Sequence, residues 1–354
     1  MLHMSNMSMS KMSVIATALT LSSVSGENLR PREYYETKFY DWIHAHESSP
    51  HFPIIEDGKT FIHFLKNFAN NDDLIETNNA VINSTDVTSV RLAHNQFSHM
   101  SADEWRDAMH LGLSPPANFA LNTHYPPTDT KAGDMTGSID WRTAGAVTGV
   151  KDQGQCGSCW AFSTTGAMEG AYKIFGKSNT LISLSEQHFV DCDDNGDHGC
   201  HGGLMDNAFA WAQENGGVCL EEEYTYTASK GKCNDSGCGT KYATPTSYTD
   251  VYKNSESALI SALNQQPVSV AIEADEKSFQ LYSSGVLTAD CGANLDHGVL
   301  VVGYGTDAGV NYWIVKNSWG DSWGEKGYIR LSRDVDQTQG QCGILSGPPS
   351  YPNM

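Results

Sequence analysis

The segment QGQCGSCWAF, residues 153–162, places two cysteines three positions apart. Such a pair could be a redox dithiol, half of a zinc site, or a structural cysteine beside a reactive one. The residues that follow predict a helix that begins near Cys159 and ends at Gly176. Its apolar face would contain Ala161, Met168, Ala171 and Phe175. A thiol in the first turn of that helix would lie at the positive end of the helix dipole, which favours the nucleophilic thiolate.

A cysteine nucleophile needs a proton acceptor, and His297 is a candidate because it opens the apolar run HGVLVVGYG, which predicts a strand. Asn317 ends a second run, YWIVKN, so its side chain could hold the imidazole by a ring N–H. Trp319, two residues later, could shield that hydrogen bond from water. Gln153 could donate its side-chain amide, together with the backbone N–H of Cys159, to an oxyanion. These residue types predict nucleophilic attack on a carbonyl group.

The three motifs resemble those of the papain family of cysteine peptidases, in its cathepsin L-like branch. QGQCGSCWAF is similar to the nucleophile motif of the family, LDHGVLVVGYG to its histidine motif, and VKNSWGDSWGEKGY to its asparagine motif. The likeness extends from about Ile139 to Tyr351. It implies an α+β papain-like fold of two domains, with a helical left domain and a β-barrel-like right domain. It also implies hydrolysis of peptide bonds by Cys159, His297 and Asn317, without a metal or a cofactor.

The resemblance further implies how a substrate would bind. Gly202 and Gly203 would pair with the backbone of an extended substrate, where a side chain would block its approach. Gly157, Asp296 and Trp319 would also line the cleft. The pocket for the substrate side chain two residues before the cut, called P2, would be formed by Leu204, Met205, Ala271, Leu295 and Gly347. All five are apolar, so we expect a preference for bulky Leu or Phe at P2.

The nine cysteines all lie between Cys156 and Cys342, and an odd number in a secreted chain suggests one unpaired thiol. By the resemblance, the disulfide pairs are Cys156 with Cys200, Cys192 with Cys233, and Cys291 with Cys342. Cys159 would remain free. The resemblance does not assign Cys219 and Cys238; we predict a fourth bridge between them, which would close a loop of about 20 residues.

The chain before the catalytic motifs divides into expected segments. Residues 1–25 have the layout of a secretory signal peptide, with one basic residue, Lys11, before an apolar run. Residues 26–113 carry helical apolar patterns and resemble the inhibitory prodomain of the same family. These patterns contain Tyr35, Phe39, Trp42, Phe61, Phe64, Leu65, Phe68, Leu74 and Ile75. Residues 114–133, rich in Pro, Thr, Asn and Gly, predict an exposed processing linker before a peptidase domain at 134–354.

The likeness to the prodomain has two parts. The helix motif is kept at Phe68, Asn71, Ile75 and Asn79. Thr60 and Phe64 stand where this motif has an acidic residue and an arginine. In the second motif, AHNQFSH, Ala93 and His99 replace a glycine and an aspartate. Because histidine gains charge as the pH falls, we expect His99 to promote release of the prodomain from about pH 6.5.

Acidic residues outnumber basic ones by 42 to 22, giving a formal net charge of -20. This charge argues against a nucleic acid or an anionic membrane as partner. No later apolar run is long enough to cross a bilayer. We expect a monomeric enzyme of the secretory pathway, in a lysosome or vacuole or outside the cell, whose partners are protein or peptide substrates and its own propeptide. N-glycosylation sequons at Asn83 and Asn234 fit this pathway.

Three other functions are open to the same residues. A thioredoxin-like redox pair would need Cys156 and Cys159 to bond each other within a βαβ unit, which the pattern lacks. A zinc site would use Cys192, His198, Cys200 and His201. That set lacks a second CxxC-type half, and the secretory pathway oxidises thiols. The third alternative is a catalytically silent homologue, or a propeptide that inhibits other cysteine peptidases.

Overall fold

The computed structural model describes most of the chain after residue 27. The described residues are 28–82, 86, 88–109, 137–176, 179–289, 291–347 and 349–354. The expected signal peptide (1–25), the linker (114–133) and the start of the peptidase domain at residue 134 lie outside them, as does the sequon residue Asn83. No helix within these described ranges is long and apolar enough to cross a membrane.

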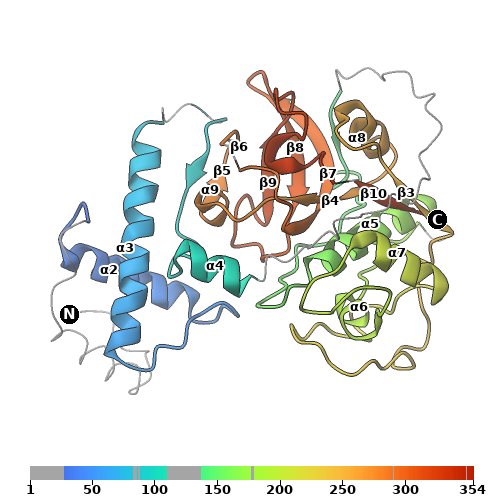
Figure 1. Cartoon of the computed structure of the whole chain (residues 1–354), viewed down its shortest axis with the longest axis horizontal. Coiled ribbons are helices and arrows are strands. Elements are labelled where there is room, and N and C mark those ends of the chain that lie inside the picture. The colour runs from blue at the N-terminus through green and yellow to red at the C-terminus, as the bar shows by residue number, and fades with distance from the viewer. Residues whose placement is uncertain are drawn as a thin grey trace.

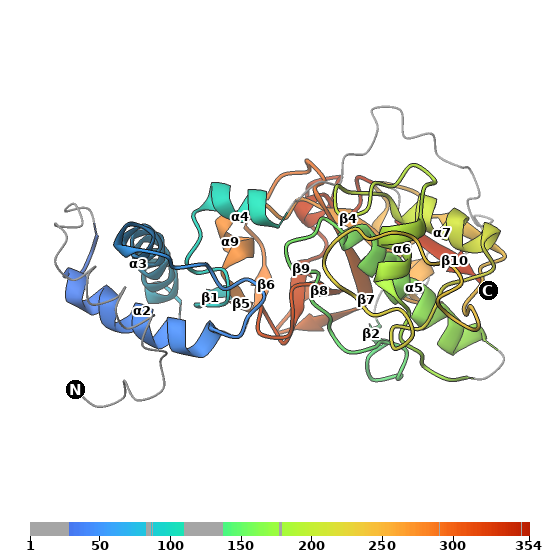
Figure 2. The same cartoon turned by 90° about the horizontal axis from the view of Figure 1, so that it is seen from below.

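The helices gather at the two ends of the molecule (Figure 1). They are α2 (Arg32–His46), α3 (Gly58–Ala80), α4 (Ala102–Ala108), α5 (Cys159–Phe175), α6 (Glu186–Cys192), α7 (Met205–Glu214), α8 (Glu256–Leu263), α9 (Lys277–Gln280) and the short 3-10 helix η1 (Gln341–Gly343). The blue helices α2 and α3 form one end, α5, α6 and α7 form the other, and the sheet lies between them. Helices α4 and α9 lie side by side where the first end meets the sheet (Figure 2). The expected α+β class is confirmed.

The main sheet has eight strands in the order β3, β10, β4, β7, β8, β9 and β6, with β2 paired to β7 beside this path. Its strands are β2 (Ile139–Asp140), β3 (Ser247–Asp250), β4 (Val268–Ile272), β6 (Val286–Leu287), β7 (His297–Asp307), β8 (Val310–Lys316), β9 (Tyr328–Ser332) and β10 (Ser350–Asn353). Strands β7 and β8 are antiparallel neighbours. The start of β7 at His297 therefore lies near the end of β8, which Asn317 follows.

The sheet is open, which corrects the expected barrel-like domain. Within the described part of the chain, the outer strands β3 and β6 do not pair with each other. Closing a barrel requires every edge strand to find a partner, and β6 has only the two residues Val286 and Leu287. The neighbouring strand β5 (Tyr282–Ser284) pairs instead with β1 (Arg91–Leu92) in a separate two-stranded sheet. The N-terminal part of the chain thus lies beside β5 and β6, at the β6 edge of the main sheet.

Helix α5 carries Cys159 as its first residue and packs against β7. The close packing depends on Gly166, because a Cβ there would lie 2.8 Å from Leu300 Cδ2. The expected apolar face is buried at Ala161, Met168 and Ala171. Phe175, also expected on that face, is 52% exposed. It is the last residue of the helix before the C-cap Gly176, where the chain leaves the core.

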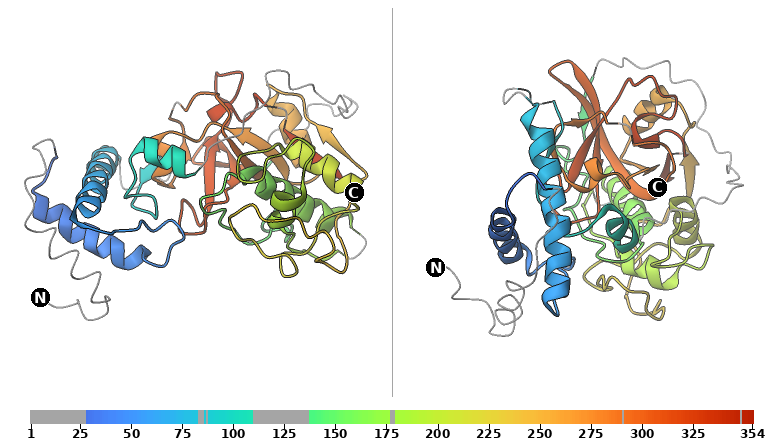
Figure 3. Two further views of the ribbon diagram at one scale, coloured as in Figure 1. Left: turned by 60° about the horizontal axis from the view of Figure 1, so that its bottom comes forward. Right: turned by 60° about the vertical axis from the view of Figure 1, so that its left-hand side comes forward.

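The N-terminal unit, residues 28–109, has its own core where α2 packs on the longer α3 (Figure 3). This core contains Tyr35, Phe39, Trp42, Ile43, Phe61, Leu65, Phe68 and Ala69. Leu74 was expected in it but is 37% exposed. Its neighbour Ile75 takes the inward position, since adjacent helical residues point in different directions.

Asparagines of the expected helix motif hold the segment around β1. Asn71 Nδ2 donates hydrogen bonds to the carbonyl oxygens of Ser98 at 2.9 Å and Met100 at 3.0 Å. Asn79 Nδ2 donates to the carbonyl oxygen of Leu92 at 2.8 Å. The long helix α3 thereby fixes the chain that leads to α4.

The two positions where charged motif residues are replaced make other contacts. Thr60 forms a capping box with Asp57 at the start of α3. Phe64 packs edge to face on His99, with ring centroids 5.4 Å apart, and Trp42 lies 5.1 Å from the same imidazole. An aromatic contact therefore occupies the place where the motif has charged groups.

His99 is 2% exposed, and burial lowers its pKa from 6.5 to about 3. The charge of Glu104 opposes this shift, whereas His46 and His51 add to it. His99 is therefore neutral in the packed unit at pH 6.5, and the expected release of the prodomain from about that pH stays a prediction. As the pH falls below 6.5, the unfolded chain takes up a proton that the packed unit does not. Stability present above pH 6.5 is lost progressively down to about pH 3.

Replacing His99 by Phe keeps an aromatic ring in place but removes the ionisable group. The acid loss of stability should then be smaller by up to about 1.4 kcal/mol per pH unit. Amide hydrogen exchange in α2 and α3, corrected for its intrinsic pH dependence and measured in a Cys159→Ala background, checks this. The exposed His44 supplies the control, His44→Gln, which should follow the wild type. An unaltered pH profile in His99→Phe would contradict the linkage.

Candidate active site

The start of α5 and the start of β7 together place Cys159. The N-cap residue Ser158 makes no side-chain cap, so the first N–H groups of α5 have no partner from it. Burial raises the pKa of the Cys159 thiol, and the backbone N–H groups of Gly298, Trp160 and Cys159 act against this shift. A Cβ at position 298 would lie 3.3 Å from the nitrogen of Trp160. A side chain at position 298 would therefore be crowded where β7 approaches Cys159.

The hydrogen bond of His297 fixes which ring nitrogen carries the proton. Its Nε2 lies 2.7 Å from Asn317 Oδ1, and the same oxygen accepts the backbone N–H of Ser318 at 2.8 Å. Since an amide oxygen can only accept, Nε2 carries the proton and Nδ1 keeps its lone pair. Nδ1 is buried without a hydrogen-bond partner. It is the ring atom that can take a proton from a thiol.

Trp319 covers this hydrogen bond. Its ring stacks on His297 with centroids 4.7 Å apart and an interplanar angle of 22°, and its side chain is fully buried. Phe97 and Trp105 of the N-terminal unit pack on the indole edge to face, at 5.8 and 5.5 Å between centroids. Trp319, which we expected to cover this hydrogen bond, therefore packs against residues of the N-terminal unit as well as residues of the peptidase domain.

Both reacting groups are neutral in this arrangement. Burial raises the pKa of the Cys159 thiol from 9.0 to about 11, against the backbone N–H groups that lower it. Burial also lowers the pKa of His297 from 6.5 to about 4, against the Asn317 hydrogen bond that raises it. The thiolate expected at the helix start is therefore outweighed by desolvation while the site is covered. Access of water would remove that penalty.

The N-terminal unit is hydrogen-bonded to the loops around the site. Gln96 Nε2 donates to the carbonyl oxygen of Trp319 at 2.6 Å, and Ser322 Oγ donates to Gln96 Oε1 at 2.9 Å. The fully buried His51 lies with Nε2 3.0 Å from Asp152 Oδ1. Because Asp152 directly precedes the expected oxyanion residue, the unit contacts the site from both sides of the nucleophile.

Gln153 is fully buried and its amide is held at both ends. Nε2 donates to the carbonyl oxygen of Cys156 at 3.0 Å, and Oε1 accepts Ser318 Oγ at 2.7 Å. A primary amide has two N–H bonds, so one remains for an oxyanion. The backbone N–H of Gly157 donates to Cys200 at 3.0 Å, which fixes the turn before the nucleophile.

Tyr226 is a site residue that the sequence motifs did not indicate. Its hydroxyl donates to the carbonyl oxygen of Gln153 at 2.8 Å and lies 2.6 Å from Ser158 Oγ. A phenol has one hydrogen, so Ser158 is the donor in the second contact. The ring packs edge to face on Phe162 with centroids 4.9 Å apart. Tyr226 thereby connects Gln153, the expected oxyanion residue, to the N-cap of α5. In the sequence, the only sign of Tyr226 is its position in the polar segment EYTYTA.

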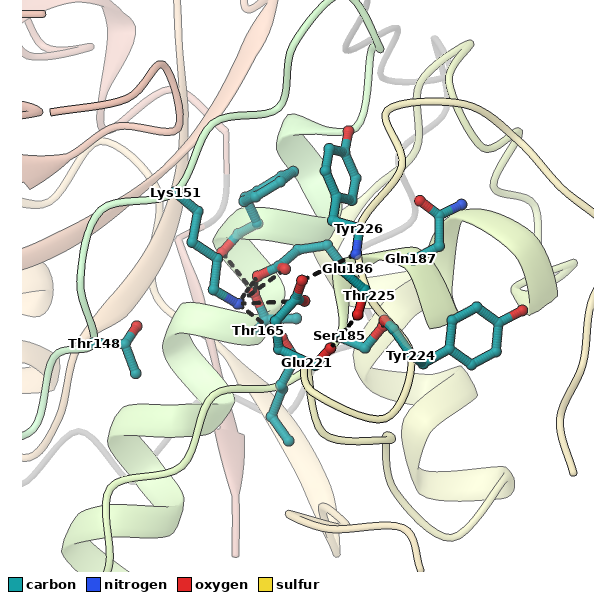
Figure 4. A network of polar contacts seen from close by, with 12 residues as sticks. Thr148, Lys151, Thr165, Ser185, Glu186, Gln187, Glu221, Tyr224, Thr225 and Tyr226 are labelled. Atoms are coloured by element: carbon teal, nitrogen blue, oxygen red, sulfur yellow. Dashed lines mark hydrogen bonds and ion pairs between the residues drawn. The ribbon is translucent and has the colours of Figure 1, made fainter. Parts of the chain in front are cut away.

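An ion cluster that reaches the backbone N–H of Tyr226 supports the same segment (Figure 4). Lys151 Nζ donates to both oxygens of Glu186, at 2.7 and 2.9 Å. Glu186 Oε1 also accepts Thr165 Oγ1 of α5 at 2.6 Å. Glu221 Oε1 accepts the backbone N–H of Tyr226 at 2.9 Å. Residue 151 is thus fixed to α5 and α6 two positions before the oxyanion residue.

The expected substrate-binding glycines have no room for side chains. Gly202 has a φ of +101°, which L side chains rarely adopt. A Cβ on Gly203 would lie 2.6 Å from the ring of Trp160. The backbone N–H of the next residue, Leu204, donates to Asp197 Oδ1 at 2.8 Å. The backbone conformation and the close packing of residues 202–204 therefore favour glycine at positions 202 and 203.

The structure brings the five expected P2 residues into one region. A Cβ on Gly347 would lie 2.9 Å from Leu295 Cδ1 and 3.7 Å from Ala271 Cβ. Leu204 and Ala271 pack against the buried cluster that contains Met205. The four residues other than Met205 are half-buried, as expected of a pocket wall.

Asp296 precedes the imidazole and is bonded to the backbone. Its Oδ1 accepts the N–H of Ala274 at 2.8 Å, and its own N–H donates to Ile272 at 2.9 Å. Burial raises its pKa to about 7. Its charge also raises the pKa of Cys159. Asp296 therefore fixes the entry into β7 and affects the nucleophile electrostatically.

The eight other cysteines form disulfides. The pairs are Cys156 with Cys200, Cys192 with Cys233, Cys219 with Cys238, and Cys291 with Cys342. Cys159 is free and buried. In this pairing Cys156 is not bonded to Cys159, as a redox dithiol would be, and Cys192 and Cys200 are not thiolate ligands for zinc.

The chain is similar in sequence to known proteins. The family model described as papain family cysteine protease matches residues 135–351. The probable cysteine protease RD21B of Arabidopsis thaliana is 49% identical over 266 residues, 75% of this chain and 56% of that protein. The cysteine endopeptidase RepA of Oryza sativa subsp. japonica is 48% identical over 271 residues, 74% of this chain and 71% of that protein. The chain thus spans little more than half of RD21B.

Solved structures of proenzymes share the fold. The recombinant stem bromelain precursor matches with a TM-score of 0.79 and 37% identity, covering 90% of this chain and 99% of that one. Digestive procathepsin L 3 from the larval midgut of Tenebrio molitor matches with a TM-score of 0.77 and 36% identity, with the same coverage. Coverage of 90% includes the N-terminal unit as well as the sheet and helices that follow.

The buried neutral thiol predicts slow alkylation of Cys159 in the full chain. With a pKa of about 11, only a small fraction is thiolate near neutral pH, and the labelling rate by iodoacetamide should still be rising at about pH 9. Mass spectrometry of the labelled chain measures this rate. Cys159→Ala is the control and should take up no label, because the other cysteines are in disulfides. Rapid labelling at about pH 6 would contradict the neutral state.

Proposed function

Because the chain belongs to the papain family of cysteine proteases, we propose that it is a cysteine endopeptidase made as a zymogen. The arrangement of Cys159, His297 and Asn317 carries this proposal. The thiol lies at the start of α5, the imidazole has an unprotonated Nδ1, and the hydrogen bond to Asn317 keeps the proton on Nε2. Such an arrangement supports attack of a thiolate on a peptide carbonyl.

The proposed reaction begins when Cys159 loses its proton to His297 Nδ1. The thiolate attacks the carbonyl carbon and forms a C–S bond, and the carbonyl oxygen takes the negative charge. The backbone N–H of Cys159 and the remaining N–H of Gln153 stabilise that oxyanion. His297 then protonates the leaving nitrogen as the C–N bond breaks. A water molecule, deprotonated by His297, hydrolyses the thioester and restores the thiol. These steps require no metal or cofactor.

Two further residues support the proposed reaction indirectly. Tyr226 holds the carbonyl group of Gln153, and Lys151 fixes the preceding turn to α5 and α6. Because an oxyanion donor must be aimed before charge develops, rigidity of this segment favours catalysis.

The N-terminal unit is the proposed intramolecular inhibitor. It packs on Trp319 through Phe97 and Trp105, bonds Asp152 through His51, and accompanies the full burial of both reacting groups. The similar solved structures are those of a bromelain precursor and a procathepsin L. We assign residues 26–113 to the prodomain and 114–133 to the processing linker, after a signal peptide at 1–25. The acid instability linked to His99 would favour release at low pH.

The four disulfides support a place in the secretory pathway, because such bonds form and persist in oxidising compartments. The sequon residue Asn234 is exposed in a loop, where a glycan could be attached. A lysosome, a vacuole and the extracellular space all meet these conditions.

The test of the proposed function is hydrolysis of a fluorogenic peptide by the full chain after incubation at acid pH. The wild type should hydrolyse it and be labelled by a thiol-directed epoxide, whereas Cys159→Ala should fold and do neither. Hydrolysis by Cys159→Ala would overturn the mechanism. No hydrolysis by a folded, processed wild type would favour the silent homologue instead.

The apolar P2 pocket predicts selectivity. Burying an unpaired Arg side chain costs several kcal/mol, whereas burying Phe gains about 1.5 to 3 kcal/mol. We expect Phe or Leu to exceed Arg at P2 by at least about tenfold in kcat/KM, a difference of about 1.4 kcal/mol. A series of dipeptide substrates that differ at P2, assayed at mildly acidic pH under reductant, measures this. Gly347→Ala, whose methyl group would lie 2.9 Å from Leu295 Cδ1, should lower the rate for Phe more than for Val. Equal or better cleavage after Arg would contradict the pocket.

A further inference from the structure

Two buried aspartates lie beneath the glycine strip, which we define as residues 202–204. Asp193 and Asp197 are 1% and 3% exposed. Asp193 Oδ1 accepts the backbone N–H of Asn195 at 2.9 Å, and Asp197 Oδ1 accepts that of Leu204 at 2.8 Å. The Oδ2 atom of each is buried, and among the described residues no N–H group and no Ser, Thr or Tyr hydroxyl donates to it. Two carboxyl groups therefore meet in a region that lacks donors for their remaining oxygens.

The two carboxyl groups are near enough that each changes the pKa of the other. A carboxylate has no hydrogen to donate, so a hydrogen bond between the two groups requires a proton on one of them. The charged groups that face the pair are the exposed Asp194, which favours protonation, and Lys230, which opposes it. Burial first, and then the neighbouring negative charge, raises the pKa of Asp197 above its ordinary value. The folded chain therefore keeps one proton here at a pH where the unfolded chain has lost it.

Asp197 connects this proton to the strip. In addition to the N–H of Leu204, its Oδ1 accepts Asn207 Nδ2 at 3.1 Å. A Cβ on Gly203 would lie 2.8 Å from Asp197 Cγ and 2.6 Å from the Trp160 ring. The carboxyl group is thus packed directly against the backbone that the substrate would pair with. A displacement of Asp197 would move the strip.

We propose that Asp197 is a positioning residue: it shares one proton with Asp193, and the protonated pair holds the glycine strip in its substrate-binding conformation. This inference rests on the proposed function, in which Gly202 and Gly203 pair with the substrate backbone. When the proton leaves as the pH rises above neutral, the two carboxylates repel and Asp197 no longer supports Leu204. Substrate affinity then falls, while the chemistry at Cys159 is affected less.

The isosteric variant Asp197→Asn tests the proposal. Its amide oxygen can accept the N–H of Leu204 while its NH2 group donates to Asp193, so no shared proton is needed. In the wild type, KM for a fluorogenic dipeptide with Phe at P2 should rise on the order of tenfold more than in Asp197→Asn between about pH 6 and 9. The ratio of KM at the two pH values is compared with the ratio of kcat, which should differ less between the two proteins.

The exposed neighbour supplies the matched control, because Asp194→Asn removes the same charge without removing the shared proton. It should keep most of the rise in KM. A rise in Asp197→Asn equal to that of the wild type overturns the proposal, as does a change confined to kcat. If Asp197→Asn does not fold, Asp193→Asn takes its place, since it leaves the acceptor of Leu204 intact.

Thermal unfolding separates this inference from the proposed function. In a Cys159→Ala background, the Tm of the wild-type pair should fall more between about pH 5.5 and 7.5 than that of Asp197→Asn, because only the pair must give up a proton. Parallel Tm curves overturn the shared proton. If the wild type hydrolyses no peptide but the Tm curves diverge, the proposed function is overturned and the shared proton is retained. The proposed effect of the proton on substrate binding is then overturned as well.

Discussion

The hydrogen bond from His297 to Asn317 has to be kept away from water, and much of the structure follows from this requirement. In water the imidazole would exchange partners and lose its fixed tautomer, whereas under Trp319 the proton stays on Nε2 and Nδ1 keeps its lone pair. Adjacent antiparallel strands bring the two residues together, and Gly298 lets them approach the start of α5. The sheet therefore supplies the imidazole of the proposed site, the helix supplies the thiol, and the indole of Trp319 covers the imidazole.

The same indole is where the N-terminal unit docks. Phe97 and Trp105 pack edge to face on the indole, and Gln96 donates a hydrogen bond to the backbone carbonyl oxygen of Trp319. The N-terminal unit therefore contacts the residue that covers the hydrogen bond between His297 and Asn317. Covering the site also withdraws water from Cys159 and His297, which favours their neutral forms. If the N-terminal unit is the inhibitor that we propose, inhibition has an electrostatic part in addition to a steric one, because a neutral thiol is a poor nucleophile.

Local patterns predicted the parts of the site that depend on neighbours in the chain. The start of α5, its end at Gly176 and the strand that opens at His297 all follow from helical or alternating apolar spacing. Features that depend on packing between distant segments were not predictable in this way. The neutral state of His99 arises from burial against α2 and α3, and Tyr226 reaches the site from a loop far along the chain. Whether the sheet closes into a barrel likewise depends on how its edge strands pair, and the spacing of residues in the sequence does not specify this pairing. The open sheet was therefore not predicted.

The aromatic docking face also bears on colloidal behaviour. Phe97, Met100 and Trp105 belong to the same buried cluster as Phe279, Trp319 and Trp323 of the peptidase domain, so departure of the N-terminal unit would turn part of a core into surface. A contiguous apolar patch of this kind promotes self-association unless net charge keeps molecules apart. The chain carries a formal charge of -20 at pH 7, but its isoelectric point is near 4.9. If the N-terminal unit departed at acid pH, protonation of carboxylates would weaken the repulsion between molecules under the same conditions that expose the patch, which would favour self-association.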